Sequence, residues 1–388
     1  ITLADVGQNV TADGTGGNGL VTIDTGSLTS VTGTFTSAGN DTMKLLLSST
    51  SGVDISAVTM TAVDNVGLDT DAGGTMTVAQ HNVINSAAGT NQVTLTDTGT
   101  FTANAAVETY VLKASGGTTI TLSAAGQNVT TGADGADTIN VAGLTATGTF
   151  NTVAADIIKI DDGGSIAGVT ETDGAVGGAL DANNLTLVDN ASVSMTSAQH
   201  NGFSGTVTAG GTEQITLTTA GTVSGESVIE TYVLSGTGNV FTLGAAAQSV
   251  NTGTGGSNTV DVSTLTATGT FTTQTTDTVK LGNGADVKGV DSGAGAGGAF
   301  TATNLTATGN ATMTRLQNNG FSGTVSVTGT NTFTMTTAGA VTALAGVDTY
   351  QLAAGAQTIT LAEAGQNVTA DGTGGNGLVT IDTGSLTS

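Results

Sequence analysis

The sequence contains no cysteine, proline or tryptophan, and only six of its 388 residues are lysine or arginine. The absence of cysteine excludes a disulfide framework. Nucleic acid is a poor partner, because its binding requires lysine and arginine to replace the counterions of the phosphates. An anionic membrane surface is unsuited for the same reason. No apolar run reaches the roughly 18 residues of a membrane span. We therefore expect neither nucleic-acid binding nor membrane insertion.

Charged residues are also scarce, and nearly all of them are acidic. They make up 9% of the chain, against about 25% in an average globular protein, yet the net charge is −24 and the pI is near 4.1. Divalent cations are the expected partners of such a surface. A positive mean hydropathy of +0.18 argues against disorder, since disordered chains lack apolar residues to bury.

The abundant residues are threonine, valine, alanine and glycine, with 60 glycines. β-Branched residues favour strands, while glycine, asparagine and aspartate supply turns. Segments such as "DTINVAGL" and "EQITLTTAG" alternate apolar and polar residues and are bounded by turn residues. This pattern is typical of short strands. The sequence predicts an all-β protein.

The chain repeats itself with a period near 119 residues. The motif "GQNVT", or its variant "AQSVN", occurs four times; "TGTF" occurs at one recurring position in modules 1 to 3, and a tyrosine occurs at another. The glutamines are Gln8, Gln127, Gln248 and Gln366; the phenylalanines are Phe35, Phe150 and Phe271; the tyrosines are Tyr110, Tyr232 and Tyr350. We divide the chain into module 1 (residues 1–119), module 2 (120–240), module 3 (241–358) and a partial module (359–388).

The partial module repeats the beginning of the chain. Residues 362–388 match residues 4–30 except at two positions, Asp5/Glu363 and Val6/Ala364. We expect the three modules to be repeated in tandem within a longer chain, of which this sequence is an excerpt. The sequence begins at Ile1 without an initiator methionine or a signal-peptide pattern.

Two all-β architectures fit these modules. In a β-solenoid, coils of about 20–24 residues stack with a spacing of about 4.8 Å, and small residues fill the narrow interior. In tandem β-sandwiches, each module would form one immunoglobulin-sized domain. Only 3% of the residues are aromatic, and no proline-rich linker separates the modules. The solenoid is the preferred prediction. The segment "MTSAQHNGF" is the least strand-like and is expected to form one helical turn or a loop.

One candidate metal site stands out. "GADGADTIN", residues 132–140, approximates a calcium-binding nonapeptide in which glycines allow tight turns and aspartates supply hard oxygen ligands. Asp134 and Asp137 are the predicted Ca²⁺ ligands, with an ordinary Asp/Gly turn as the alternative. Turns around Asp161, Asp162 and Asp286 are weaker candidates.

No catalytic constellation is evident. The chain has no Ser/His/Asp arrangement and no phosphate loop ending in Gly-Lys-Ser/Thr. His81 and His200 share a position that holds Asn318 in module 3, which favours a structural hydrogen bond. The three tyrosines are expected to form a packing ladder with solvated hydroxyls. The carboxylates beside them recur in every module, which argues for structure against glycoside hydrolysis; they are Glu108, Glu230 and Asp348. We expect no enzyme activity.

The run "IETYVLSGTGNVFTLGAAAQSVNTGTGGSNTVDVSTLTATGTF", residues 229–271, resembles the β-strand repeats of secreted bacterial surface proteins, among them RTX-like adhesins and S-layer proteins. The resemblance extends over essentially the whole chain as a style of repeat. It implies export to the bacterial cell surface, dependence on calcium, and a structural or adhesive role.

These observations predict an extracellular structural protein that self-associates into a filament, a sheath or a surface layer. The alternative is the stalk of a giant repeat adhesin whose binding domain lies outside this sequence. Cell-surface polysaccharide is a further candidate partner.

Overall fold

The computed structural model describes residues 1–12, 19–38, 41–113, 115–171, 174–370, 377–384 and 386. It contains two compact units. Unit 1 consists of Ile1–Val188 with Gly202–Thr208, and unit 2 consists of Asp189–Asn201 with Ala209–Ser388. The division falls inside sequence module 2, so the compact units do not follow the sequence modules.

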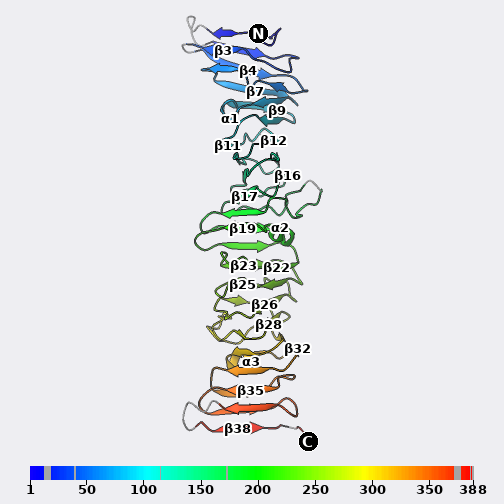
Figure 1. Ribbon diagram of the computed structural model, residues 1–388, viewed down its shortest axis with the longest axis vertical. Coiled ribbons are helices and arrows are strands. Elements are labelled where there is room, and N and C mark those ends of the chain that lie inside the picture. The colour runs from blue at the N-terminus through cyan, green and yellow to red at the C-terminus, as the bar shows by residue number, and fades with distance from the viewer. Residues whose placement is uncertain are drawn as a thin grey trace. The chain divides into compact units, whose positions relative to one another are not determined.

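The predicted β-solenoid is confirmed. The chain is nearly all β, with about 4% helix, and winds through about 19 turns whose strands stack in parallel. This corresponds to about 20 residues a turn. In each unit, strands of successive turns lie one above another (Figure 1). The alternative of tandem β-sandwiches is wrong, because such sandwiches are built from antiparallel strands.

Unit 1 contains four parallel sheets and one helix. The first sheet comprises β2 (Leu20–Asp24), β4 (Thr42–Leu47), β7 (Asn65–Thr70) and β9 (Ile84–Ala88). The second comprises β1 (Val10–Ala12), β3 (Thr34–Ser37) and β6 (Thr59–Thr61). The third comprises β5 (Val53–Asp54), β8 (Gly73–Met76), β10 (Gln92–Leu95), β12 (Thr109–Val111), β14 (Asn128–Thr130) and β16 (Phe150–Asn151). The fourth comprises β11 (Thr100–Thr102), β13 (Thr119–Thr121), β15 (Thr138–Asn140), β17 (Ile157–Ile160), β18 (Asn184–Leu187) and β20 (Val207–Thr208). The helix is α1 (Val78–His81).

Unit 2 repeats this plan with four further sheets. The first comprises β19 (Ser192–Met195), β21 (Gln214–Leu217), β23 (Thr231–Leu234), β25 (Ser249–Asn251) and β27 (Phe271–Thr272). The second comprises β22 (Thr222–Ser224), β24 (Val240–Thr242), β26 (Thr259–Ser263), β28 (Thr278–Leu281), β30 (Asn304–Ala307) and β32 (Val325–Val327). The third comprises β29 (Ala285–Asp286), β31 (Ala311–Met313), β33 (Thr332–Met335), β35 (Thr349–Leu352) and β37 (Asn367–Ala370). The fourth comprises β34 (Gly339–Thr342), β36 (Gln357–Thr360) and β38 (Val379–Asp382). Its helix is α3 (Arg315–Gly320), and α2 (Ser197–Gly202) spans the point where the chain passes from unit 2 to unit 1.

The core consists of apolar columns. Alternate residues of a strand point inward, and parallel pairing in register places each inward residue over its counterpart in the next turn. Phe101 pairs with Ile120, Ile120 with Ile139, and Ile139 with Ile158, and all four side chains are buried. Each such side chain contributes about 1.5–3 kcal/mol through burial. Threonines occupy the outward positions beside Phe101 and Ile120.

The helical turn expected in the "MTSAQHNGF" segment is present in every module, as α1, α2 and α3. Thr77 and Thr314 cap α1 and α3, and each forms a reciprocal capping box with the glutamine three residues later. The helical turn accompanies a break in the sheet: β9 does not pair with β11, and β32 does not pair with β34.

Candidate functional site

The structure separates the two predicted calcium ligands. Asp134 is exposed, whereas Asp137 is completely buried. Asp137 Oδ1 accepts a hydrogen bond from the Thr118 N–H (2.8 Å), and Oδ2 accepts one from the Gly132 N–H (3.3 Å). Burial raises the pKa of the Asp137 carboxyl, while these N–H groups act in the opposite direction. Both oxygens of Asp137 are therefore engaged by the backbone.

Asp137 belongs to a ladder of side chains that joins successive turns. The Asp137 N–H donates to Asp156 Oδ1 (2.8 Å), one turn further along. In unit 2, the Asn258 N–H donates to Asp277 Oδ1 (2.8 Å), and Asn258 Oδ1 accepts from the Asn239 N–H (2.9 Å). Module 3 has Asn258 at the position that Asp137 holds in module 2. The position therefore requires an acceptor oxygen and not a negative charge.

Among the described residues, no group of three or more histidine, aspartate or glutamate side chains is arranged to hold a metal ion. Calcium at Asp134 and Asp137 stays a prediction. Of the weaker candidates, Asp286 pairs with the Lys288 ammonium, and Asp161 lies 3.9 Å from Lys159 Nζ. Asp162 also has a partner in the structure.

The recurring glutamines hold corners of the solenoid. Gln127 is buried; its Oε1 accepts from the N–H groups of Ser123 (2.9 Å) and Ala124 (3.0 Å). Its Nε2 donates to the carbonyls of Asn104 (2.8 Å) and Val107 (2.9 Å), which lie in the preceding turn. Gln248 and Gln366 make equivalent contacts. The sequence showed that these glutamines recur, but not what they bind.

The glycine that precedes Phe35, Phe150 or Phe271 by two residues packs on the carbonyl of such a glutamine. A Cβ added at Gly148 would lie 1.9 Å from the Gln127 carbonyl oxygen, and one added at Gly269 would lie 1.9 Å from that of Gln248. Gly33 stands in the same relation to Gln8. The glutamine motif and the "TGTF" motif, about 20 residues apart in the sequence, are thus in direct contact in the structure. The periodicity of the sequence alone did not reveal this contact.

The expectation of solvated tyrosine hydroxyls is wrong. Tyr110, Tyr232 and Tyr350 are completely buried, and the hydroxyl of each accepts a backbone N–H from six residues earlier, at 2.7–2.8 Å. Burial raises the pKa of all three. The hydroxyl proton is then available to a second acceptor.

The second acceptor is the side chain at the repeat position that holds histidine in modules 1 and 2 and asparagine in module 3. Tyr110 Oη lies 3.1 Å from His81 Nε2, and Tyr232 Oη lies 3.1 Å from His200 Nε2. In module 3, the Tyr350 hydroxyl donates to Asn318 Oδ1 (3.4 Å). Burial lowers the pKa of His81 and lowers that of His200 to about 4. The neutral imidazoles act as acceptors, in agreement with the predicted structural role.

The repeated carboxylates beside the tyrosines also join turns. Glu108, Glu230 and Asp348 each accept a backbone N–H from the turn before, at 2.7–2.9 Å. The donor in module 2 is the N–H of Glu213, itself buried, and its burial together with the Glu230 carboxylate raises the pKa of Glu213. These carboxylates therefore bind backbone, as their recurrence indicated.

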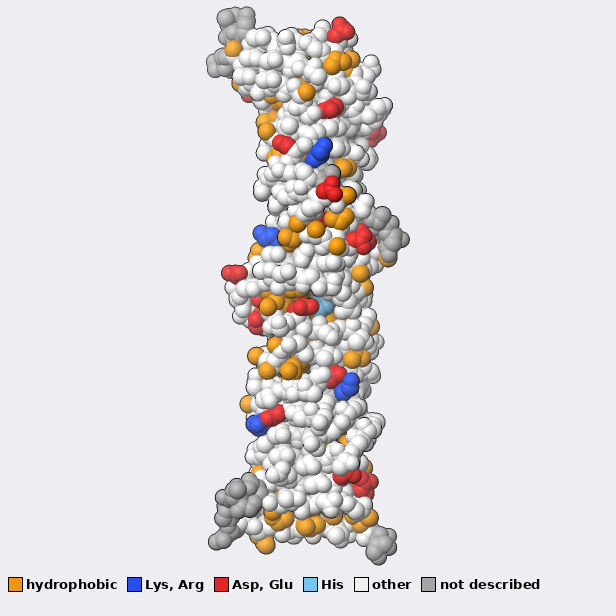
Figure 2. All heavy atoms as spheres, in the orientation of Figure 1, with side chains coloured by type: hydrophobic (Ala, Val, Ile, Leu, Met, Phe, Trp, Pro, Cys, Tyr) orange, Lys and Arg blue, Asp and Glu red, His pale blue; other side chains and the backbone are white. Residues whose placement is uncertain are grey.

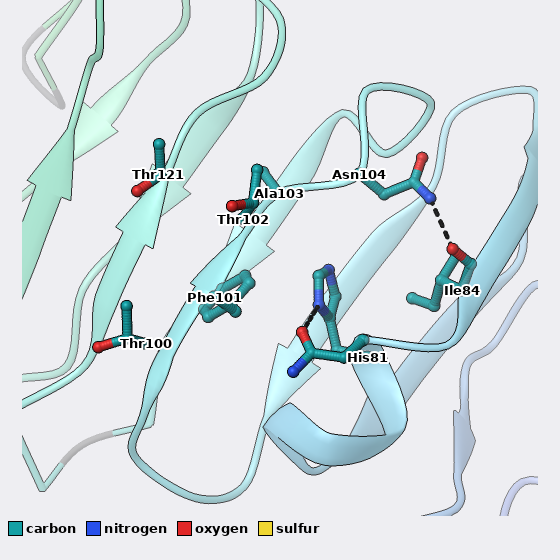
Figure 3. A pocket seen from close by; sticks show the side chains of 9 residues that line it. His81, Ile84, Thr100, Phe101, Thr102, Ala103, Asn104 and Thr121 are labelled. Atoms are coloured by element: carbon teal, nitrogen blue, oxygen red, sulfur yellow. Dashed lines mark hydrogen bonds between the residues drawn. The ribbon is translucent and has the colours of Figure 1, made fainter.

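A cavity of about 500 Å³ opens in unit 1 where the sheet breaks between β9 and β11. Its lining residues are His81, Asn82, Ile84, Thr100, Phe101, Thr102, Ala103, Asn104 and Thr121. The rings of His81, from the end of α1, and Phe101, from β11, lie edge to face with their centroids 4.6 Å apart (Figure 3). Asn104 Nδ2 donates to the Ile84 carbonyl (3.0 Å). Unit 2 has a corresponding cavity of about 400 Å³ between β32 and β34.

The surface carries few charges. On the face drawn in Figure 2, a few basic and acidic side chains are scattered among hydrophobic side chains and a larger area of other side chains and backbone. No helix in the described ranges has the length and apolar character needed to cross a bilayer. Comparison with known proteins yields no match among family models, curated proteins or solved structures.

Proposed function

We propose that this chain is a non-catalytic structural protein that self-associates outside the cell into a filament, a sheath or a surface layer. The observation that carries the proposal is the use of its buried polar side chains. In each module, a recurring glutamine and a recurring carboxylate bind backbone groups of the preceding turn. A recurring buried tyrosine contacts the side chain of a histidine or an asparagine. The polar groups of these side chains are used in hydrogen bonds that hold the solenoid together. Further modules can extend the same contacts.

Secretion to a bacterial surface and calcium binding are parts of this proposal. The resemblance to β-strand repeats of surface proteins supports the location. The net charge of −24 supports calcium, because acidic chains that pack together repel one another unless cations neutralise them.

Electron microscopy of the purified protein tests the assembly. A module of about six turns advances roughly 29 Å at ~4.8 Å a turn, so fibres or a lattice with an axial repeat on that scale are expected. Dispersed particles at all concentrations would contradict the proposal.

Glycan arrays probed with the same protein address the alternative of an adhesin stalk. Binding of a defined glycan would assign recognition to this segment, whereas a stalk should bind no glycan.

A further inference from the structure

One edge of β11 has no strand beside it. On its paired side, the Thr119 N–H donates to the Gly99 carbonyl and the Ala103 N–H donates to the Thr121 carbonyl, both at 2.8 Å. Backbone groups of successive residues in a strand point to opposite sides. The N–H and C=O groups of Thr100 and Thr102 therefore face the cavity between β9 and β11, and within the described ranges they have no hydrogen-bond partner.

The corresponding edge in unit 2 is closed by a side chain. Asn319 Nδ2 donates to the Ala340 carbonyl (2.9 Å), and Asn319 Oδ1 accepts from the Thr342 N–H (3.0 Å). In a parallel sheet, one residue of a neighbouring strand makes this pair of bonds, donating to one carbonyl and accepting from the N–H two residues later. Asn319 thus occupies the place of a residue in an added parallel strand.

The equivalent of Asn319 in unit 1 is Asn82, and its side chain is engaged elsewhere. Asn82 Oδ1 lies 3.4 Å from His81 Nδ1. In unit 2, the residue at the position of His81 is Asn318, whose Nδ2 donates to the Thr342 carbonyl (2.8 Å) and thereby helps to close the edge. In module 2, His200 stands at the position of His81, yet Asn201 Nδ2 donates to the Thr222 carbonyl at the edge of β22 (2.9 Å). The open edge of β11 therefore follows from the placement of the Asn82 side chain, and an asparagine beside it, as in module 3, supplies a further edge contact.

We propose that the cavity between β9 and β11 binds an extended, positively charged peptide segment of a partner protein as a parallel strand added to β11. The Thr100 carbonyl and the Thr102 N–H would take up the two bonds that Asn319 supplies in unit 2. A volume of about 500 Å³ admits a few residues. Strand addition obtains affinity from such main-chain bonds. The net charge of −24 favours lysine and arginine in the segment.

The probe is a synthetic peptide, Lys-Thr-Val-Thr-Val-Thr-Lys, with neutral ends. Its binding is measured by the NMR shift of the Thr102 amide and by calorimetry. T102P removes the N–H that faces the cavity and leaves the bonds of Phe101 and Ala103 to β13 intact. H81N reproduces the Asn318–Asn319 pair and should release Asn82 to close the edge. H81N should block both hydrogen bonds and weaken binding about tenfold or more, whereas T102P removes one of them and should weaken binding about fivefold.

N82A is the matched control, since it removes the equivalent of the Asn319 side chain that closes the edge of β34, and it should bind the peptide as the wild type does. Hydrogen exchange of the Thr102 amide should be fast in the wild type and slow in H81N. A peptide with N-methylated valines should not bind, and one with glutamate in place of lysine should bind less tightly. The proposal is overturned if the wild type does not bind the probe, or if H81N and T102P bind it equally well. It is also overturned if the groove instead takes a second copy of the chain, seen as self-association that H81N abolishes.

Discussion

His81, His200 and Asn318 perform the same task at the residue scale. Each accepts the proton of a buried tyrosine hydroxyl whose oxygen is held by a backbone N–H. Histidine can accept only while it is neutral, whereas an asparagine carbonyl accepts at any pH. The exchange of the two residues was visible in the sequence and correctly favoured structure over catalysis. The burial of the tyrosine hydroxyls was not foreseen, because a strand pattern does not tell that each hydroxyl meets a backbone N–H from the turn six residues earlier.

The first prediction concerns acid stability. The pKa of His200 is lowered to about 4, so the unfolded chain binds the proton first as the pH falls below about 6.5. The free energy of unfolding should fall by about 3 kcal/mol between pH 7 and pH 4 from this residue. H200N should remove this contribution of His200 to the loss of stability. Urea unfolding of the wild type and of H200N at pH 7 and pH 4 measures the free energies of unfolding.

N318H is the reciprocal control. It should introduce a new loss of stability at acid pH in the protein that carries it, because the imidazole would be buried against the Tyr350 hydroxyl. Equal pH dependence of H200N and the wild type would show that the His200 imidazole is not held neutral by the fold.

The second prediction concerns the glycine that meets a corner glutamine. A Cβ at Gly148 would lie 1.9 Å from the Gln127 carbonyl oxygen, so G148A should force the turns apart and cost about 3 kcal/mol. G126A is the matched control: Gly126 is a near neighbour in sequence, but a Cβ there meets nothing within 4 Å. Thermal unfolding should separate the two variants clearly, and equal melting temperatures would contradict the contact.

At the scale of the element, the helical turn and the short strands were predicted, and the structure confirms both. Strand alternation and turn residues act within a few positions of the chain, so a local pattern carries them. The breaks in the sheet beside α1 and α3 were not predicted. They depend on whether a strand meets a partner one turn away, and no residue within the strand encodes that.

The third prediction concerns the corner itself. Q127L should remove the acceptor for Ser123 and Ala124 and the donor for Asn104 and Val107. Buried backbone groups left without partners cost about 1–3 kcal/mol each, so the variant should lose at least about 3 kcal/mol of stability. Q92A on the exposed side of β10 is the control and should change stability by less than about 0.5 kcal/mol. Denaturant titration measures both.

For the whole molecule, the main electrostatic problem is one-signed charge: 30 acidic residues against six basic ones. Asp137, which the sequence offered as a metal ligand, instead accepts backbone N–H groups, as does Asp156 one turn further along. Exposed acids such as Asp134 remain available to cations at the surface and between chains. This is where calcium is expected to act.

The fourth prediction, which rests on the proposed function, is that EGTA disperses the assembly and that calcium restores it while an equal ionic strength of sodium does not. Sodium only screens charge, whereas a bound ion adds linked stability. Light scattering and thermal melting record the change. Assemblies that keep their form and melting temperature in excess EGTA would show that calcium does not hold them together.

The sequence by itself determined the period, the all-β class and the short strands, and it favoured a solenoid over tandem β-sandwiches and marked the segments that form the helical turns. These follow from residue alternation, from turn residues and from recurrence, all of which can be read along one chain. Only the tertiary structure decided that Gln127 holds the carbonyls of Asn104 and Val107, that Asp137 meets the Thr118 N–H, and that the edge of β11 is open while that of β34 is closed. Each of these depends on which backbone groups come to face each other across one turn of about 20 residues, and that is fixed by the winding of the chain and not by the residues on either side.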